Sequence, residues 1–99
     1  MASSSFGADA DKPLIIDVRT EAEWNEGHLE GAILIPVEVI GEQIGTVAKE
    51  KSMRIYVYCR SGRRSQVAKE TLAKFSYKDV INLGSVEDAA RKMKVKIIK

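Results

Sequence analysis

Short apolar runs alternate along the chain with segments of helical periodicity. The apolar runs, each long enough for one buried strand, cover residues 14–19, 32–36, 54–58 and 80–83. The helical segments that follow them are residues 20–27, about 40–47, 66–75 and 85–93. Strands that alternate with helices predict an α/β fold, with a small parallel sheet of four to five strands and helices on both faces.

Polar residues mark where two of these helices begin. Thr20 with Glu23, and Ser85 with Asp88, have the spacing of a capping box, in which the first side chain accepts a hydrogen bond from the backbone N–H three residues later. Gly27 is predicted to end the first helix, because glycine readily adopts the backbone conformation that follows a helix.

The second predicted helix has a clear apolar face but also contains two residues that disfavour helix formation. Ile40, Ile44 and Val47 lie on one side of a helix. Gly41 and Gly45 lie inside it, and each costs about 1 kcal/mol relative to alanine. At the end of the chain, residues 95–98 are predicted to form a last edge strand.

Size and charge limit the classes of protein that this chain can belong to. Ninety-nine residues make one domain, which we place at residues 13–99. Residues 1–12 are small and polar and lack the apolar core of a secretory signal, so we expect a disordered segment, a cloning remnant or the start of a processed chain. A net charge of +2 does not favour nucleic acid or a membrane surface, and no apolar run is long enough to span a bilayer.

The most informative stretch is the loop that follows the third apolar run. It begins with Cys59, the only cysteine, and continues with five residues before the next helix, Arg60, Ser61, Gly62, Arg63 and Arg64. A strand, a tight loop and a helix direct successive backbone N–H groups toward one point, and the helix N-terminus adds partial positive charge. These groups and the arginines favour a thiolate, so the loop is predicted to be an anion-binding site around a reactive sulfur.

The alternative without a functional role is that Cys59 is an inert core residue and that the arginines are ordinary solvent-exposed side chains. It does not explain three arginines and a glycine at the carboxyl end of a strand, where open α/β sheets bind ligands. A single cysteine forms no internal disulfide, and the sequence holds no metal-ligand cluster. His28, the only histidine, is interpreted as a structural residue that hydrogen-bonds backbone at the turn of residues 27–29.

Three segments resemble the signatures of rhodanese domains. The first contains the runs Ile16-Asp17-Val18-Arg19, Glu23-Trp24, Gly27-His28-Leu29, Gly31-Ala32 and Ile35-Pro36. The second is similar to the family's active-site loop and comprises Cys59-Arg60-Ser61-Gly62-Arg63-Arg64-Ser65. The third, a weaker match, is Asn82-Leu83-Gly84. The short chain is similar to the single-domain type represented by phage shock protein E, which is periplasmic.

This resemblance implies a rhodanese-like fold and thiosulfate sulfurtransferase activity without a cofactor or metal. It implies that Cys59 becomes a persulfide, that the amides of the loop hold that sulfur, and that Arg60 and Arg64 contact the anion. It also implies that Asp17 and Arg19 brace the site from the neighbouring strand. If the chain starts as a processed mature protein, we expect it in the periplasm, and otherwise in the cytoplasm.

The sequence departs from the family pattern in two places. Gly84 is followed by Ser85, where members commonly have a second glycine, so we expect a different loop there. Members also begin with an additional strand that has no counterpart here, which leaves four parallel strands. Residues 95–98 are then candidates to cover the exposed sheet edge.

Several functional alternatives stay open at this point. A small anionic donor such as thiosulfate and a cyanide or thiol acceptor are the expected partners of a monomer, but a sulfur carrier that serves a protein partner has the same loop. A signalling domain without chemistry is disfavoured by the presence of Cys59. A cysteine phosphatase or arsenate reductase is disfavoured because its arginine follows after five intervening residues, whereas Arg64 follows after four.

The partner of Arg64 is a separate question. Arg64 is predicted at the first turn of a helix, where the dipole disfavours a cation unless an anion compensates. That anion is either the bound donor or a fixed carboxylate, with Asp17 and Glu23 as the candidates. We expect the donor.

Overall fold

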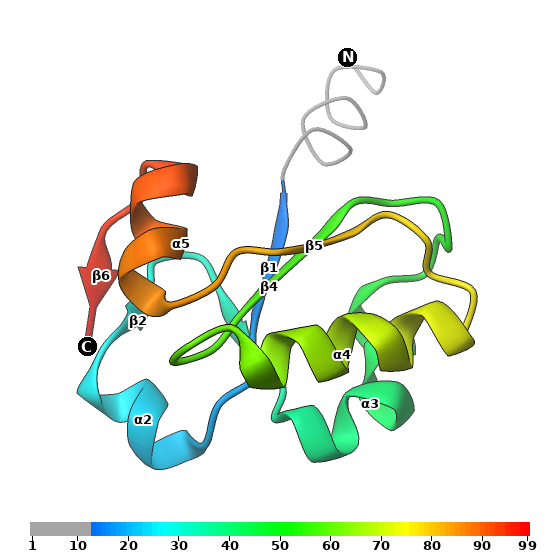
Figure 1. Cartoon of the computed structure of the whole chain (residues 1–99), viewed down its shortest axis with the longest axis horizontal. Helices are drawn as coiled ribbons and strands as arrows, with labels where there is room; N and C mark the ends of the chain where they lie inside the picture. The colour runs from blue at the N-terminus through cyan, green and yellow to red at the C-terminus, as the bar shows by residue number, and fades with distance from the viewer. Residues whose placement is uncertain (1–12) are drawn as a thin grey trace.

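A computed structural model of the protein describes residues 13–99, and the expectation for residues 1–12 lies outside the described residues (Figure 1). In chain order, the elements are β1 (Leu14–Asp17), α2 (Glu21–Glu26), β2 (His28–Leu29), β3 (Ile33–Leu34), the 3₁₀ turn η1 (Val37–Val39), α3 (Ile40–Val47), β4 (Ile55–Tyr58), α4 (Arg63–Lys74), β5 (Val80–Asn82), α5 (Val86–Met93) and β6 (Ile97–Ile98). None of the helices within the described range combines the length and apolarity that crossing a membrane requires.

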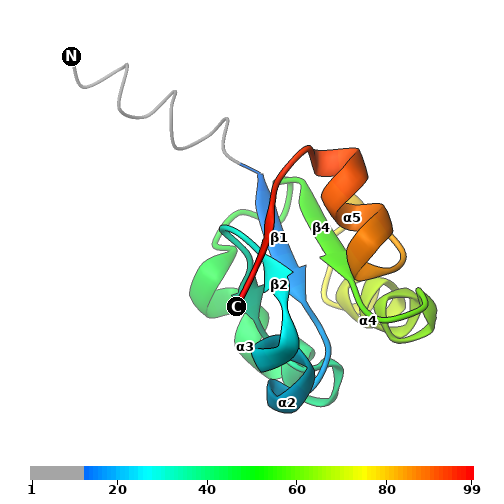
Figure 2. The ribbon, with the colours of Figure 1, turned by 90° about the vertical axis from the view of Figure 1, so that its left-hand side faces the viewer.

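The main sheet has four strands in the order β3-β1-β4-β5, and every neighbouring pair is parallel. Helices α3 and α4 lie on one side of it, and α5 lies on the other with β2 and β6 (Figures 1 and 2). The predicted α/β fold with a parallel sheet and helices on both faces is therefore confirmed. The central strands β1 and β4 end at the same edge, with Asp17 opposite Tyr58.

The alternation of side chains along β4 decides which way the cysteine points. Ile55, Val57 and Cys59 are fully buried in the larger apolar cluster, beneath α3 and α4. Tyr58 is buried in the smaller cluster on the opposite face, with Leu29 among its neighbours. Since successive side chains of a strand face opposite sides, the thiol is directed toward the face that α4 covers.

The last strand does not lie where we expected it. Strand β6 pairs antiparallel with β2, with His28 opposite Ile98 and Leu29 opposite Ile97, in a separate two-stranded sheet. The expectation that residues 95–98 cover the edge of the main sheet was wrong. Helix α5 returns the chain to the side where β2 lies, and a hydrogen bond from the Glu30 N–H to the Lys96 carbonyl (2.9 Å) extends the pairing.

Helix α4 begins at Arg63, three residues before the predicted start. Gly62 precedes it in the left-handed conformation, with φ of 95°, which glycine adopts without steric cost. Arg63 and Arg64 therefore belong to the first turn of the helix, at its positive end.

Both predicted N-terminal caps are present. The first has both hydrogen bonds of a capping box, and the second has the bond to the serine side chain. The Thr20 hydroxyl accepts from the Glu23 N–H (3.2 Å) and the Glu23 carboxylate accepts from the Thr20 N–H (3.0 Å). The Ser85 hydroxyl accepts from the Asp88 N–H (3.0 Å). Ser85 has φ of −81°, so its backbone conformation does not require a glycine, and its hydroxyl caps α5.

The two glycines of α3 have different surroundings. A Cβ at Gly41 would lie 2.6 Å from Cε2 of Phe75, at the end of α4, whereas a Cβ at Gly45 would have no atom within 4 Å. Gly41 thus permits the close approach of the Phe75 ring to α3, which the sequence pattern alone does not reveal.

We predict that Gly45→Ala raises the free energy of unfolding by about 1 kcal/mol, the difference in helix propensity. Gly41→Ala should gain clearly less, because the new methyl group has to displace the Phe75 ring. Urea denaturation of both variants and the parent measures this difference. Equal stabilisation by both substitutions would show that the ring contact has no energetic weight.

Candidate active site

Cys59 lies directly after β4, where the chain turns toward α4. Its N–H donates to the Gly84 carbonyl (3.0 Å), which fixes the start of the loop to the segment after β5. Its side chain is fully buried. The Gly62 N–H donates to Sγ over 2.9 Å, and the Ser65 hydroxyl lies 3.5 Å from Sγ. The loop thus places a backbone donor against the sulfur, as predicted from the strand–loop–helix pattern.

The surroundings of the sulfur favour its anion. Burial alone would raise the pKa of Cys59, but hydrogen bonds from the Ser65 side chain and from the backbone N–H groups of Ser65, Ser61 and Gly62 outweigh it, so the pKa is lowered. The donors come from the loop and the first turn of α4. This arrangement suits a nucleophilic thiolate and does not require a general base.

Two polar residues that we did not predict as site residues complete this environment. The Ser65 hydroxyl donates to Oδ1 of Asn82 (2.6 Å), and Nδ2 of Asn82 donates to the Gly62 carbonyl (3.0 Å). Asn82 is the last residue of β5, next to β4 in the sheet. Two sequence signals were available for Asn82: its position at the carboxyl end of a neighbouring strand and its place in the third family signature.

Asp17 and Arg19 form a buried pair at the end of β1. The Arg19 guanidinium donates to both carboxylate oxygens, at 2.9 Å from Nε and 2.7 Å from Nη2. Nη2 also donates to the Gly27 carbonyl (2.6 Å), and the guanidinium lies 5.7 Å from the centre of the Tyr58 ring. Arg19 thereby connects β1, the end of α2 and the residue before Cys59.

Arg64 is held by a carboxylate. Its Nη1 and Nη2 donate to Oε1 and Oε2 of Glu23 over 2.8 and 2.9 Å, so the pair is bidentate. The Arg64 guanidinium holds the pKa of Glu23 down at about 2, against a smaller opposing effect of burial. Our expectation that the donor is the partner of Arg64 is corrected: Glu23 occupies its guanidinium, and Asp17 is engaged by Arg19.

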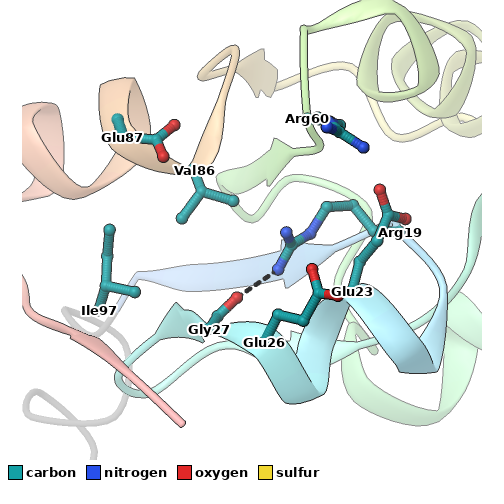
Figure 3. Close-up of a pocket in the computed structure, with 8 residues that line it drawn as sticks. All are labelled: Arg19, Glu23, Glu26, Gly27, Arg60, Val86, Glu87 and Ile97. Carbon is teal, nitrogen blue, oxygen red and sulfur yellow. Dashed lines mark hydrogen bonds between the residues drawn. The ribbon is translucent and has the colours of Figure 1, made fainter.

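A cavity of about 240 Å³ opens beside the loop (Figure 3). Its lining is strongly charged and comprises Arg19, Glu23, Glu26, Gly27, Arg60, Val86, Glu87 and Ile97. Arg19 and Glu23 have partners of opposite charge, whereas Arg60, Glu26 and Glu87 are exposed and form no ion pair within residues 13–99. The free charge at the cavity is therefore mixed, with two carboxylates and one guanidinium.

The other predicted residues lie apart from this cavity. Arg63 is exposed on the first turn of α4 and has no ion-pair partner in the part of the chain described. His28 donates from Nδ1 to the Trp24 carbonyl (2.9 Å), and its ring stacks on Trp24 at 3.5 Å between centres. The structural interpretation of His28 is confirmed, and the geometry shows no pairing between His28 and Cys59.

Comparison with known proteins places this geometry in a family. The family model "Rhodanese-like domain" matches residues 6–91. The thiosulfate sulfurtransferase PspE of Escherichia coli is 40% identical over 75 residues, which cover 76% of this chain and 72% of that protein. A sulfurtransferase of Allochromatium vinosum is 34% identical over 76 residues, or 77% of this chain and 69% of that protein.

Two further proteins are similar to this chain, one in sequence and one in a solved structure. YrkF of Bacillus subtilis, whose name proposes a sulfur carrier, is 36% identical over 76 residues, which are 76% of this chain and 40% of that protein. A solved structure of a rhodanese with anions from E. coli superposes with a TM-score of 0.81 at 35% identity, over 89% of this chain and 99% of that one. The chain therefore belongs to the rhodanese-like domain family, and its relatives support a sulfurtransferase.

Proposed function

We propose that the protein is a thiosulfate sulfurtransferase that carries sulfur as a persulfide on Cys59. The observation that carries this proposal is the 2.9 Å hydrogen bond from the Gly62 N–H to Sγ, within a loop that lowers the pKa of the thiol. The thiosulfate sulfurtransferase activity in the name of PspE supports the choice of donor.

The reaction proceeds by double displacement. The Cys59 thiolate attacks the outer sulfur of thiosulfate, the sulfur–sulfur bond of the donor breaks, and sulfite leaves with the bonding pair. The outer sulfur, now bound to Sγ, carries the negative charge that the loop amides stabilise. Cyanide or a thiol then attacks that sulfur, forms thiocyanate or a new persulfide, and returns Cys59 to the thiolate.

Access to the sulfur is part of this mechanism. Sγ is fully buried, and Cys59 is not among the residues that line the neighbouring cavity. Part of the structure that covers Sγ therefore has to move before the donor reaches it. Arg60 is the loop arginine that both lines the cavity and is free to pair with the donor.

A sulfur carrier that receives sulfur from a protein is the second candidate function. Two observations favour it: the unpaired carboxylates of Glu26 and Glu87 in the cavity, which repel a dianion, and the name of the relative YrkF. Comparison of turnover with thiosulfate against turnover with a persulfide-bearing protein separates the two functions. The remaining alternative, a cysteine phosphatase, predicts hydrolysis of phosphate esters, which we do not expect.

We predict that incubation with thiosulfate adds one sulfur atom to the intact mass of the protein and that cyanide removes it. Cys59→Ser should abolish both the mass gain and thiocyanate production while the protein stays folded, because a serine hydroxyl is a poor nucleophile without a base. Sulfur transfer within about tenfold of the parent rate in this variant would contradict the assignment.

Arg60→Ala should raise KM for thiosulfate by about tenfold, which corresponds to the loss of about 1.4 kcal/mol from one charged hydrogen bond. The melting temperature should stay unchanged, because Arg60 is exposed and unpaired in the described structure. Arg63→Ala is the matched control and should leave KM unchanged, because Arg63 is exposed on the first turn of α4 and does not line the cavity. Equal KM values for the parent and Arg60→Ala would remove Arg60 from the binding site.

Arg64→Ala should act on stability, because it breaks the bidentate pair between α4 and α2. We expect a loss of about 1 kcal/mol at neutral pH, since the pair is partly exposed. Glu23 has a pKa of about 2 in the folded protein and about 4.3 when unfolded, so the pair stabilises the fold above pH ~4.3 and this contribution is lost as the pH falls toward 2.

Urea denaturation from neutral to acid pH measures this effect. The difference between parent and Arg64→Ala should shrink between pH ~4 and ~2, whereas Arg63→Ala should match the parent throughout. A raised KM for thiosulfate with unchanged stability would restore Arg64 as a contact of the donor.

A further inference from the structure

The side chain of Asn82 makes four hydrogen bonds that join two loops. Its Oδ1 accepts from the Ser65 hydroxyl (2.6 Å) and from the Gly84 N–H (2.9 Å). Its Nδ2 donates to the Gly62 carbonyl (3.0 Å) and to Oε1 of Gln66 (3.3 Å). The primary amide has two donor and two acceptor positions, so its hydrogen-bonding capacity is fully used.

The backbone partners leave this amide a single orientation. The Gly84 N–H can only donate and therefore has to meet the oxygen, while the Gly62 carbonyl can only accept and therefore has to meet the nitrogen. It follows that the Ser65 hydroxyl, 2.6 Å from the oxygen, is the donor in its bond with Asn82.

A hydroxyl has one proton, and three acceptors surround that of Ser65. They are Oδ1 of Asn82 at 2.6 Å, the Gly62 carbonyl at 3.1 Å and Sγ of Cys59 at 3.5 Å. The short contact to Asn82 competes with the sulfur for this proton, so the Ser65 hydroxyl is a variable donor to Sγ. The Gly62 N–H, at 2.9 Å from Sγ, has no such competing acceptor and is the constant donor to an anionic sulfur.

Gly62 itself is positioned through its carbonyl. The residue has the left-handed conformation and no side chain that could hold it. Its carbonyl accepts the first hydrogen bond of α4, from the Gln66 N–H at 3.0 Å, and the bond from Nδ2 of Asn82. Helix and amide together limit the rotation about the Cα–C bond of Gly62 and so support the turn that presents its N–H to Sγ.

We propose that Asn82 is a positioning residue for the nucleophile: by holding the Gly62 carbonyl, its amide directs the Gly62 N–H at Sγ and stabilises the sulfur anion. That this role serves sulfur transfer rests on the proposed function. The effect of Asn82 on the ionisation of Cys59 does not depend on it.

The test is the variant Asn82→Asp, which has the shape of asparagine. It keeps the acceptor for Ser65 and Gly84 and places an oxygen, in place of the donor, against the Gly62 carbonyl. Because it also adds negative charge, Gln66→Glu is the matched control, since it adds the same charge on a contact of the amide and leaves the bond to Gly62 in place. The ionisation midpoint of Cys59 is read from the ultraviolet absorbance of the thiolate, with the Cys59→Ser form of each protein subtracted.

We expect Asn82→Asp to raise the midpoint by about one pH unit, a tenfold loss of thiolate below the midpoint, and Gln66→Glu to raise it by less than half of that. Equal shifts in the two variants would attribute the effect to charge alone and overturn the proposal. An unchanged midpoint with a lowered melting temperature would also overturn it, because Asn82 would then support only the fold.

If Asn82→Asp does not fold, Asn82→Ser removes the amide without adding charge and should raise the midpoint in the same direction. The titration uses no sulfur donor, so its outcome is independent of the proposed function. A raised midpoint in a protein that takes no sulfur from thiosulfate keeps the role of Asn82 and rejects the donor. Transfer of sulfur from thiosulfate with no shift in the midpoint supports the proposed function and rejects the role of Asn82.

Discussion

A charged sulfur atom that is shielded from water needs hydrogen-bond donors from the protein, and the architecture around Cys59 meets this requirement. The side chain is fully buried, where an uncompensated anion would be very costly. The donors are backbone N–H groups of the turn between β4 and α4, which become available because the first N–H groups of a helix have no partner within it. The position of β4 between β1 and β5 then allows both neighbouring strands to support the turn.

The arginines near the loop are of two kinds, those with an ion-pair partner and those without one among the described residues. Arg19 and Arg64 are neutralised by Asp17 and Glu23, and they connect β1 and α4 to the surroundings of α2. Arg60 is left as the free cation at the cavity. Of the three loop arginines, Arg64 is neutralised by Glu23, so the positive field at the loop is weaker than the sequence indicates.

Much of this account could be predicted from the sequence, because the relevant signals are local. Alternating apolar runs predicted the parallel sheet, the Thr20–Glu23 spacing predicted a cap that is present, and the glycine-containing turn after Cys59 predicted donors at the sulfur. The catalytic and binding roles that the family resemblance implies for the site residues are still predictions.

What the sequence did not predict depends on contacts between distant segments. The pairing of β6 with β2 involves two residues on each strand, too few for a periodic pattern. The choice between the donor and a carboxylate as the partner of Arg64 depends on how α2 packs, and Glu23 is forty-one positions away in the chain. Asn82 gave two weak signals, as a polar residue at a strand end and as the first residue of the third family signature, and neither one indicates its four hydrogen-bond partners.

The most direct test of the central claim is the ionisation of Cys59 in the unmodified protein. Titration of the thiolate absorbance, with the Cys59→Ser protein subtracted, gives its midpoint without any assumption about donor or acceptor. The account predicts a midpoint clearly below the value of about 8.5 for a free thiol, because the loop donors outweigh burial. A midpoint at or above that value would show that burial dominates and that the loop does not stabilise an anionic sulfur.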